Sequence, residues 1–178
     1  MQPLPIDHYS WAARGFHWLT AALVLAAYIL SRGGPEARVF SAANQGNLTL
    51  HESLGFAVLA LTAARLAWRA IDQAPAPIKM PGWMQALASL VHWVLFGLLV
   101  LVPLTAIVGS WLEGHALTLY LVGDIGAPFA TSAALGHTIL RLHPWLADAI
   151  LWIAGLHAFA ALFHHFVLGD RVLRTMTH

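Results

Sequence analysis

Four long apolar segments constrain this chain more than any other feature of its sequence. They cover residues 11–30, 48–70, 83–112 and 144–168, and charged side chains are rare within them. A helix needs about 20 predominantly apolar residues to cross the hydrocarbon core of a bilayer, and each segment is that long. The sequence therefore predicts an all-α protein, in which residues 1–178 form one integral membrane domain built as a four-helix bundle.

The composition supports a membrane protein and narrows its chemistry. Hydrophobic residues make up 59% of the chain and charged residues 10%, with a mean hydropathy of +0.69, whereas about a quarter of a soluble domain is charged. A net charge of +1 argues against nucleic acid as a partner. The chain has no cysteine, which excludes disulfides, attached c-type haem and iron–sulfur clusters. Eleven histidines remain, so any metal chemistry must use imidazole.

Details of the segments refine this expectation. Arg14 and His17 interrupt the first segment, which we interpret as a membrane span and not as a cleaved signal. Pro103 predicts a kink within the third segment. Pro144 suits the first turn of a helix, so the fourth segment is expected to begin there, with His143 just before it. Residues 113–142 are expected to form a long loop with at most a short interfacial helix.

The distribution of Lys and Arg predicts the orientation, because cytoplasmic loops carry an excess of them. The N-terminus, the connection between the second and third segments and the C-terminus must share one side of the membrane. Six cations lie on that side, namely Arg14, Arg65, Arg69, Lys79, Arg171 and Arg174. Three lie on the other side, namely Arg32, Arg38 and Arg141. Both termini are therefore predicted to be cytoplasmic, and this side is called inner below.

Four histidines fall at two matched depths. His143 and His157 are 14 positions apart in the fourth segment, which is about 21 Å along one helix face. His17 lies at the inner depth of His157, and His51 lies at the outer depth of His143. Two such pairs across a four-helix bundle are what two six-coordinate b-type haems require. Iron held by two imidazoles has no open position, so it carries electrons and does not bind oxygen.

These histidines have other interpretations. A zinc site would need ligands in compact spacing, and His51-Glu52 lacks the second histidine. A proton-coupled transporter would need an acidic residue mid-membrane, and none was identified. A non-redox scaffold whose histidines bind nothing is a further alternative. Within the haem interpretation, His92 competes as an inner ligand, and His137 competes more weakly as an outer one.

Glycines inside the apolar segments bear on the same question. A glycine lets a flat macrocycle approach the helix backbone, but it equally lets two helices pack closely. Both explanations remain open for each glycine from the sequence alone. The glycines concerned are Gly55, Gly97, Gly109 and Gly155.

Four stretches of this sequence resemble the bacterial cytochrome b561 family of four-span, di-haem inner-membrane proteins. They are "RGFHWL" (14–19), "LHESLG" (50–55), "LTAARLAWR" (61–69) and "GLHAFAALFHHFVLGDRVLRTM" (155–176). The resemblance covers nearly the whole chain. It implies that His17 and His157 ligate the inner haem and that His51 and His143 ligate the outer one. It also implies that His92 is a neighbour of the haem or of a quinone.

The resemblance implies a function as well. One member of the family is a superoxide oxidase that passes electrons from superoxide to ubiquinone, and others are quinone-linked electron carriers. We therefore expect transmembrane electron transfer, most specifically a superoxide:ubiquinone oxidoreductase. The alternative is a quinol-oxidising cytochrome that passes electrons to a periplasmic partner protein. In one departure, residues 74–83 hold a single lysine, Lys79, where the superoxide-oxidising relative is lysine-rich.

Three further residues are expected to serve the inner haem or a quinone. His164 lies seven residues after His157, about 10 Å further along the same helix face, where it is expected to hydrogen-bond a quinone carbonyl or a haem propionate. His165 points about 80° away and is interpreted as an interfacial histidine. Arg14 and Arg65 are expected to support the inner haem, because a guanidinium pairs well with a propionate or an anionic quinone.

Arg141 is the predicted access residue for superoxide. It lies two residues from His143, so its positive charge would attract a small anion near the outer haem. The outer side as a whole is roughly neutral, so the attraction is expected to be local. The acidic residues counted on that side are Glu36, Glu52, Glu113 and Asp124.

Overall fold

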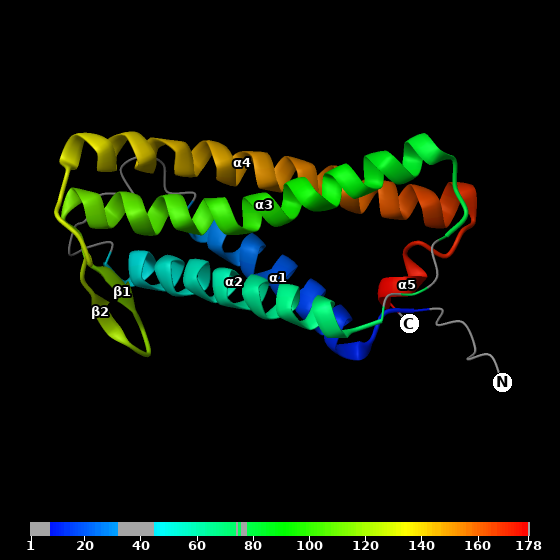
Figure 1. Cartoon of the computed structure of the whole chain (residues 1–178), viewed down its shortest axis with the longest axis horizontal. Coiled ribbons are helices and arrows are strands. Elements are labelled where there is room, and N and C mark those ends of the chain that lie inside the picture. Colours follow the sequence, from blue (N-terminus) through cyan, green and yellow to red (C-terminus); the bar gives the residue numbers. More distant parts are fainter. Residues whose placement is uncertain (1–7, 32–44, 74, 76–77, 178) are drawn as a thin grey trace.

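The computed structural model describes residues 8–31, 45–73, 75 and 78–177, and four long helices dominate it (Figure 1). The helices are α1 (Trp11–Leu30), α2 (Gln45–Ile71), α3 (Gly82–Glu113) and α4 (Ala133–Phe163). A π-helical segment, η2 (His164–Leu168), continues α4, and the short α5 (Arg174–Thr177) follows. All four long helices are long and apolar enough to cross a membrane. The predicted all-α bundle with four membrane spans is confirmed.

The bundle has two layers, each made of consecutive helices. Most close contacts join α1 to α2 and α3 to α4, and contacts between the layers are sparse (Figure 1). The layers meet at an apolar cluster of Val58, Leu98, Leu99 and Ile150, against which Leu23 of α1 packs. Val58 is seven residues from His51, and Ile150 is seven residues from both His143 and His157. The cluster therefore lies midway between the two histidine levels.

Large apolar side chains cover the outside of the bundle. Leu25, Leu101, Trp152 and Phe159 are all exposed. An apolar surface this extensive is found where lipid, and not water, is the surrounding medium. Burial inside the bundle is correspondingly limited, and it concentrates on α3.

The fourth helix begins earlier than predicted. It starts at Ala133 and not at Pro144, which lies in its interior together with His143. The cause is packing against α3. A Cβ atom on Gly136 would lie 2.8 Å from the backbone nitrogen of Glu113 and 2.9 Å from the carbonyl oxygen of Gly109, so the two backbones touch. This contact extends the helix beyond the proline, whose missing N–H membrane helices tolerate. When η2 is counted as the end of the fourth helix, the other helix ends differ from the predicted ones by at most three residues.

A β-hairpin occupies part of the predicted long loop. Strands β1 (Leu117–Leu119) and β2 (Gly123–Ile125) pair antiparallel, with Leu117 opposite Ile125. The backbone N–H of Thr118 donates to the Glu52 carboxylate at 2.8 Å, and that of Tyr120 donates to the Ser53 hydroxyl at 3.1 Å. These bonds fix the hairpin to the first turns of α2.

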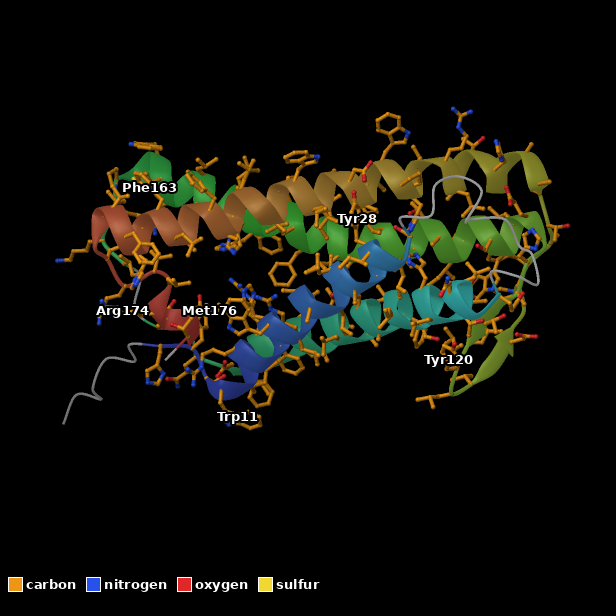
Figure 2. The ribbon with its side chains drawn as sticks, turned by 180° about the vertical axis from the view of Figure 1, so that it is seen from behind. Trp11, Tyr28, Tyr120, Phe163, Arg174 and Met176 are labelled. Carbon is orange, nitrogen blue, oxygen red and sulfur yellow. The ribbon has the colours of Figure 1, made fainter. Side chains whose placement is uncertain are left out.

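The opposite end of the bundle holds the start of α1, the end of α2 and α5. The Ser10 hydroxyl donates to Asp72 at 2.6 Å, and the indole N–H of Trp18 donates to the carbonyl oxygen of Met176 at 3.0 Å. Figure 2 shows Trp11 and Met176 at this same end. We call it the terminal end and the other the hairpin end. The predicted outer cations Arg32 and Arg38 and the acid Glu36 lie outside the described residues.

Candidate functional site

Two pairs of histidines face each other across the layers. His17 of α1 and His157 of α4 lie toward the terminal end, with ring centres 6.3 Å apart. His51 of α2 and His143 of α4 lie toward the hairpin end, with ring centres 5.9 Å apart. The structure thus brings together the same pairs that the depth of each residue predicts, and each pair joins one layer to the other.

The spacing within each pair suits a shared metal ion. A metal bonds an imidazole nitrogen at about 2 Å, and that nitrogen is about 1 Å from the ring centre, so two rings on one iron have centres about 6 Å apart. Both pairs are close to this value. His92 of α3 also approaches His157, but their ring centres are 5.2 Å apart, which is shorter by about 1 Å. The geometry favours His17 over His92 as the partner of His157.

Hydrogen bonds orient the two rings at the hairpin end. The Nδ1–H of His51 donates to the carbonyl oxygen of Ala27 at 2.9 Å, and that of His143 donates to the carbonyl oxygen of Val102 at 2.8 Å. Because a carbonyl can only accept, each Nδ1 carries the proton, and Nε2 of the neutral ring keeps its lone pair. Histidines that bind metals usually show this arrangement. Both rings are therefore prepared to coordinate through Nε2.

A cavity of about 830 Å³ surrounds the pair at the hairpin end. All four long helices line it, and its walls include His51, His143 and Gly55. A Cβ atom on Gly55 would meet nothing within 4 Å, and the same holds for Gly97 and Gly155. These three glycines leave open space beside the backbone, as a flat macrocycle needs. Gly109 is different, because a Cβ atom there would lie 2.6 Å from the side chain of Leu140. This glycine allows α3 and α4 to pack closely.

Charged side chains stand around this cavity. Arg141, the predicted access residue, lines it and is exposed. Glu113 also lines it, and its carboxylate lies 3.5 Å from Nδ1 of His137. The His137 side chain is 70% exposed and lies outside the imidazole pair. Among the described residues, no three His, Asp or Glu side chains gather as a compact zinc site would need.

Sequence reasoning missed one acidic residue of the cavity. Asp148 of α4 lines the wall, and its carboxylate accepts a hydrogen bond from the Tyr28 hydroxyl of α1 at 3.0 Å. The signal was available, because an aspartate five residues after His143 interrupts an apolar segment. An ionisable residue inside a span marks a functional region by default.

Two arginines lie in the half of the bundle that holds His17 and His157. The Arg65 guanidinium lies 5.0 Å from the centre of the Phe96 ring, which is a cation–π contact. The Nε of Arg14 is buried and has no hydrogen-bond partner among the described residues. A buried donor left unsatisfied is costly, so this guanidinium fits an acidic group such as a haem propionate.

An imidazole–carboxylate pair closes α4 at the terminal end. The Nδ1–H of His164 donates to Asp170 at 2.5 Å, and the other carboxylate oxygen accepts from the backbone N–H of Val172 at 2.9 Å. Asp170 was expected only to end the helix, so its contact with His164 was missed. His165 packs its ring against Phe166. Lys79 is exposed in the connection between α2 and α3.

Comparison with known proteins agrees with the motifs. The profile of the family described as prokaryotic cytochrome b561 matches residues 8–178. A probable superoxide oxidase CybB of Yersinia pestis is 31% identical over 173 residues, which cover 94% of each chain. Cytochrome b561 homolog 2 of Escherichia coli (strain K12) is 27% identical over 171 residues, covering 96% of this chain and 91% of the relative. Cytochrome b562 of Cereibacter sphaeroides is 32% identical over 166 residues, covering 90% and 89%.

These matches extend over nearly the full length of both partners and include every helix of the bundle. They confirm the resemblance drawn from the sequence motifs. The chain therefore belongs to the prokaryotic cytochrome b561 family, as a bacterial membrane protein that binds b-type haem and transfers electrons across the membrane.

Proposed function

We propose that the protein is a superoxide:ubiquinone oxidoreductase with two b haems, in a bacterial inner membrane with both termini in the cytoplasm. Two superoxide anions each lose one electron to become dioxygen, and one ubiquinone takes up both electrons and two protons. The observation that carries this proposal is the presence of two imidazole pairs at the spacing of a shared iron, one in each half of the bundle.

The four histidines are the proposed haem ligands. His17 and His157 would hold the haem at the terminal end, and His51 and His143 would hold the one at the hairpin end. When bound, haem supplies one-electron chemistry, and the protein supplies position and environment. The carbonyl groups of Ala27 and Val102 orient two of the rings. The apolar cluster between the two levels keeps water out of the centre of the bundle.

Superoxide is proposed to reach the hairpin end near Arg141. Among the described residues, no ion pair neutralises this guanidinium, so its charge can attract an anion. Two nearby carboxylates already have partners, because Glu52 accepts from the Thr118 N–H and Glu113 faces His137. The relative from Yersinia pestis, named a probable superoxide oxidase, supports the same substrate.

Ubiquinone is proposed to bind at the terminal end. Asp170 accepts the Nδ1–H of His164, so the remaining ring nitrogen, Nε2, is the one that faces a quinone. In the neutral ring Nε2 accepts from the hydroxyl of the reduced quinone, and in the imidazolium it donates to a quinone carbonyl. Arg14, Arg65 and Lys79 supply positive charge in the same part of the bundle, which favours haem propionates and a partly reduced quinone. His92, beside His157, is proposed to contact the haem or the quinone.

One observation favours an alternative function. Among the residues that the structure describes, the cavity at the hairpin end is lined by the carboxylates of Glu52, Glu113 and Asp148 and by one arginine, Arg141. This balance weakens the attraction for a superoxide anion. It suits a cytochrome that oxidises quinol and passes electrons to a partner protein in the periplasm.

Stopped-flow mixing of the oxidised protein with superoxide distinguishes the superoxide oxidase from the quinol-oxidising cytochrome. We expect the haem absorbance to change faster than in a boiled control, to slow with ionic strength, and to reverse when ubiquinone is added. Arg141→Gln should slow the first phase several-fold, whereas Arg174→Gln, an exposed arginine at the terminal end, should not. A rate equal to the boiled control would reject superoxide and leave the quinol-oxidising alternative.

A further inference from the structure

The tip of the β-hairpin is apolar and fully presented to its surroundings. Tyr120, Leu121 and Val122 form the turn between β1 and β2, and their side chains are 61%, 99% and 67% exposed. The strand residues Leu117 and Leu119 are instead buried, at 4% and 5%. The hairpin thus packs one set of apolar side chains into the bundle and leaves the set at its tip uncovered.

The tip lies on the flank of the bundle and not beyond its end. In Figures 1 and 2 the hairpin folds back, so that its tip is level with the first turns of α2 and short of the outer ends of α3 and α4. Hydrogen bonds hold it there, because Tyr120 bonds through its N–H to the Ser53 hydroxyl and through its own hydroxyl to the carbonyl oxygen of Gly46 at 3.3 Å. The predicted membrane span of α2 begins at residue 48, within these first turns.

We propose that the hairpin tip inserts into the lipid interface of the membrane leaflet at the hairpin end. Leu121 and Val122 would occupy the boundary between headgroups and acyl chains, and Tyr120 would lie at headgroup level, where tyrosine is enriched. The turn carries no charge that would oppose insertion. The tip also lies beside the first turns of α2, where Leu50 is exposed.

The sideways position of the tip favours lipid over a soluble protein. A water-soluble partner approaches the end of the bundle from outside the membrane. The tip lies short of that end along the bundle axis and points away from the axis (Figure 1). Asp124 is the acidic residue of the hairpin. It lies in β2 and not in the turn, and its carboxylate accepts a hydrogen bond from the Thr118 hydroxyl at 2.8 Å.

Anchoring the tip stabilises the wall of the cavity. Leu117 of the hairpin lines that cavity, and Thr118 bonds Glu52, the neighbour of His51. A tip fixed in lipid therefore keeps the hairpin in contact with the cavity wall next to His51. The inference concerns the fold at the membrane surface, so it does not depend on which electron donor the protein uses.

Spin labelling tests the proposal directly, because the natural chain has no cysteine to remove. Leu121→Cys carries a nitroxide, and Ala130→Cys, an exposed position in the connection to α4, is the matched control. Both variants, loaded with haem, are reconstituted in phosphatidylcholine–phosphatidylglycerol vesicles. Power saturation then compares oxygen, which concentrates in lipid, with a water-soluble nickel chelate.

We expect the label at Leu121 to be more accessible to oxygen than to nickel, and the label at Ala130 to show the reverse. A second label at Val122→Cys should agree with Leu121, which guards against a local disturbance by one label. Equal nickel accessibility at Leu121 and Ala130 would overturn the proposal. Spin–spin broadening at Leu121 that persists at high lipid-to-protein ratio would also overturn it, in favour of contact with a second copy of the chain.

Discussion

Replacing His17 with alanine should remove one haem and leave the other. His157 would then have His92 as its nearest alternative partner, at a ring-centre distance of 5.2 Å. Two rings on one iron need about 6 Å, so His92 would have to move by about 1 Å in a helix packed along its length against α4. The other pair is 14 residues away on α4, about 21 Å, with the apolar cluster between.

We therefore expect haem content to fall from two per chain to about one in His17→Ala, and to stay at two in His92→Ala. Haem extracted as its pyridine complex, divided by protein concentration, gives this number, and electron paramagnetic resonance of the oxidised protein identifies which low-spin signal is lost. Two haems in His17→Ala, or one in His92→Ala, would show that His92 and not His17 is the partner of His157.

Three further outcomes are expected. His51→Ala should remove the haem at the hairpin end and keep the other, as measured by haem content and by the remaining low-spin signal. Arg65→Leu should lower the midpoint potential of the haem at the terminal end or slow quinone reduction, because a cation favours the reduced, more negative state. If a redox titration and the rate of quinone reduction are both unchanged, Arg65 serves only to set the membrane topology. Gly136→Ala should destabilise the bundle by about 1–3 kcal/mol, since the new Cβ meets backbone atoms of α3. Gly15→Ala, whose Cβ meets nothing within 4 Å, is its control in thermal unfolding, and equal stability of the two would refute the close packing.

The sequence predicts the bundle well because each of its signals is local. Apolar runs mark the four helices, and their predicted bounds fail only where another helix intervenes, as when Gly136 meets the backbone of α3 and extends α4 past Pro144. The histidine pairs are predictable because a spacing of 14 residues repeats one helix face. Their use as haem ligands remains a prediction.

Contacts between distant segments are what the sequence could not supply. The hairpin depends on Thr118 meeting Glu52, a residue 66 positions earlier, and nothing near either residue announces that contact. The pairing of Tyr28 with Asp148 crosses from the first helix to the fourth in the same way. Asp170 reaches His164 only because α4 ends in a π-helical turn, which no residue pattern predicts.

The two-layer architecture bears on how the protein assembles. Each layer consists of helices that follow one another in the chain, so α1 with α2 can enter the membrane as one helical hairpin before α3 and α4 are synthesised. Both histidine pairs join the α1–α2 layer to the α3–α4 layer. Because metal binding contributes directly to folding free energy, cofactor insertion would clamp two preformed halves that otherwise meet mainly at the central apolar cluster. Chains made in haem-starved cells should accordingly accumulate with both helix pairs inserted, and proteases should readily cut the junction between the two pairs.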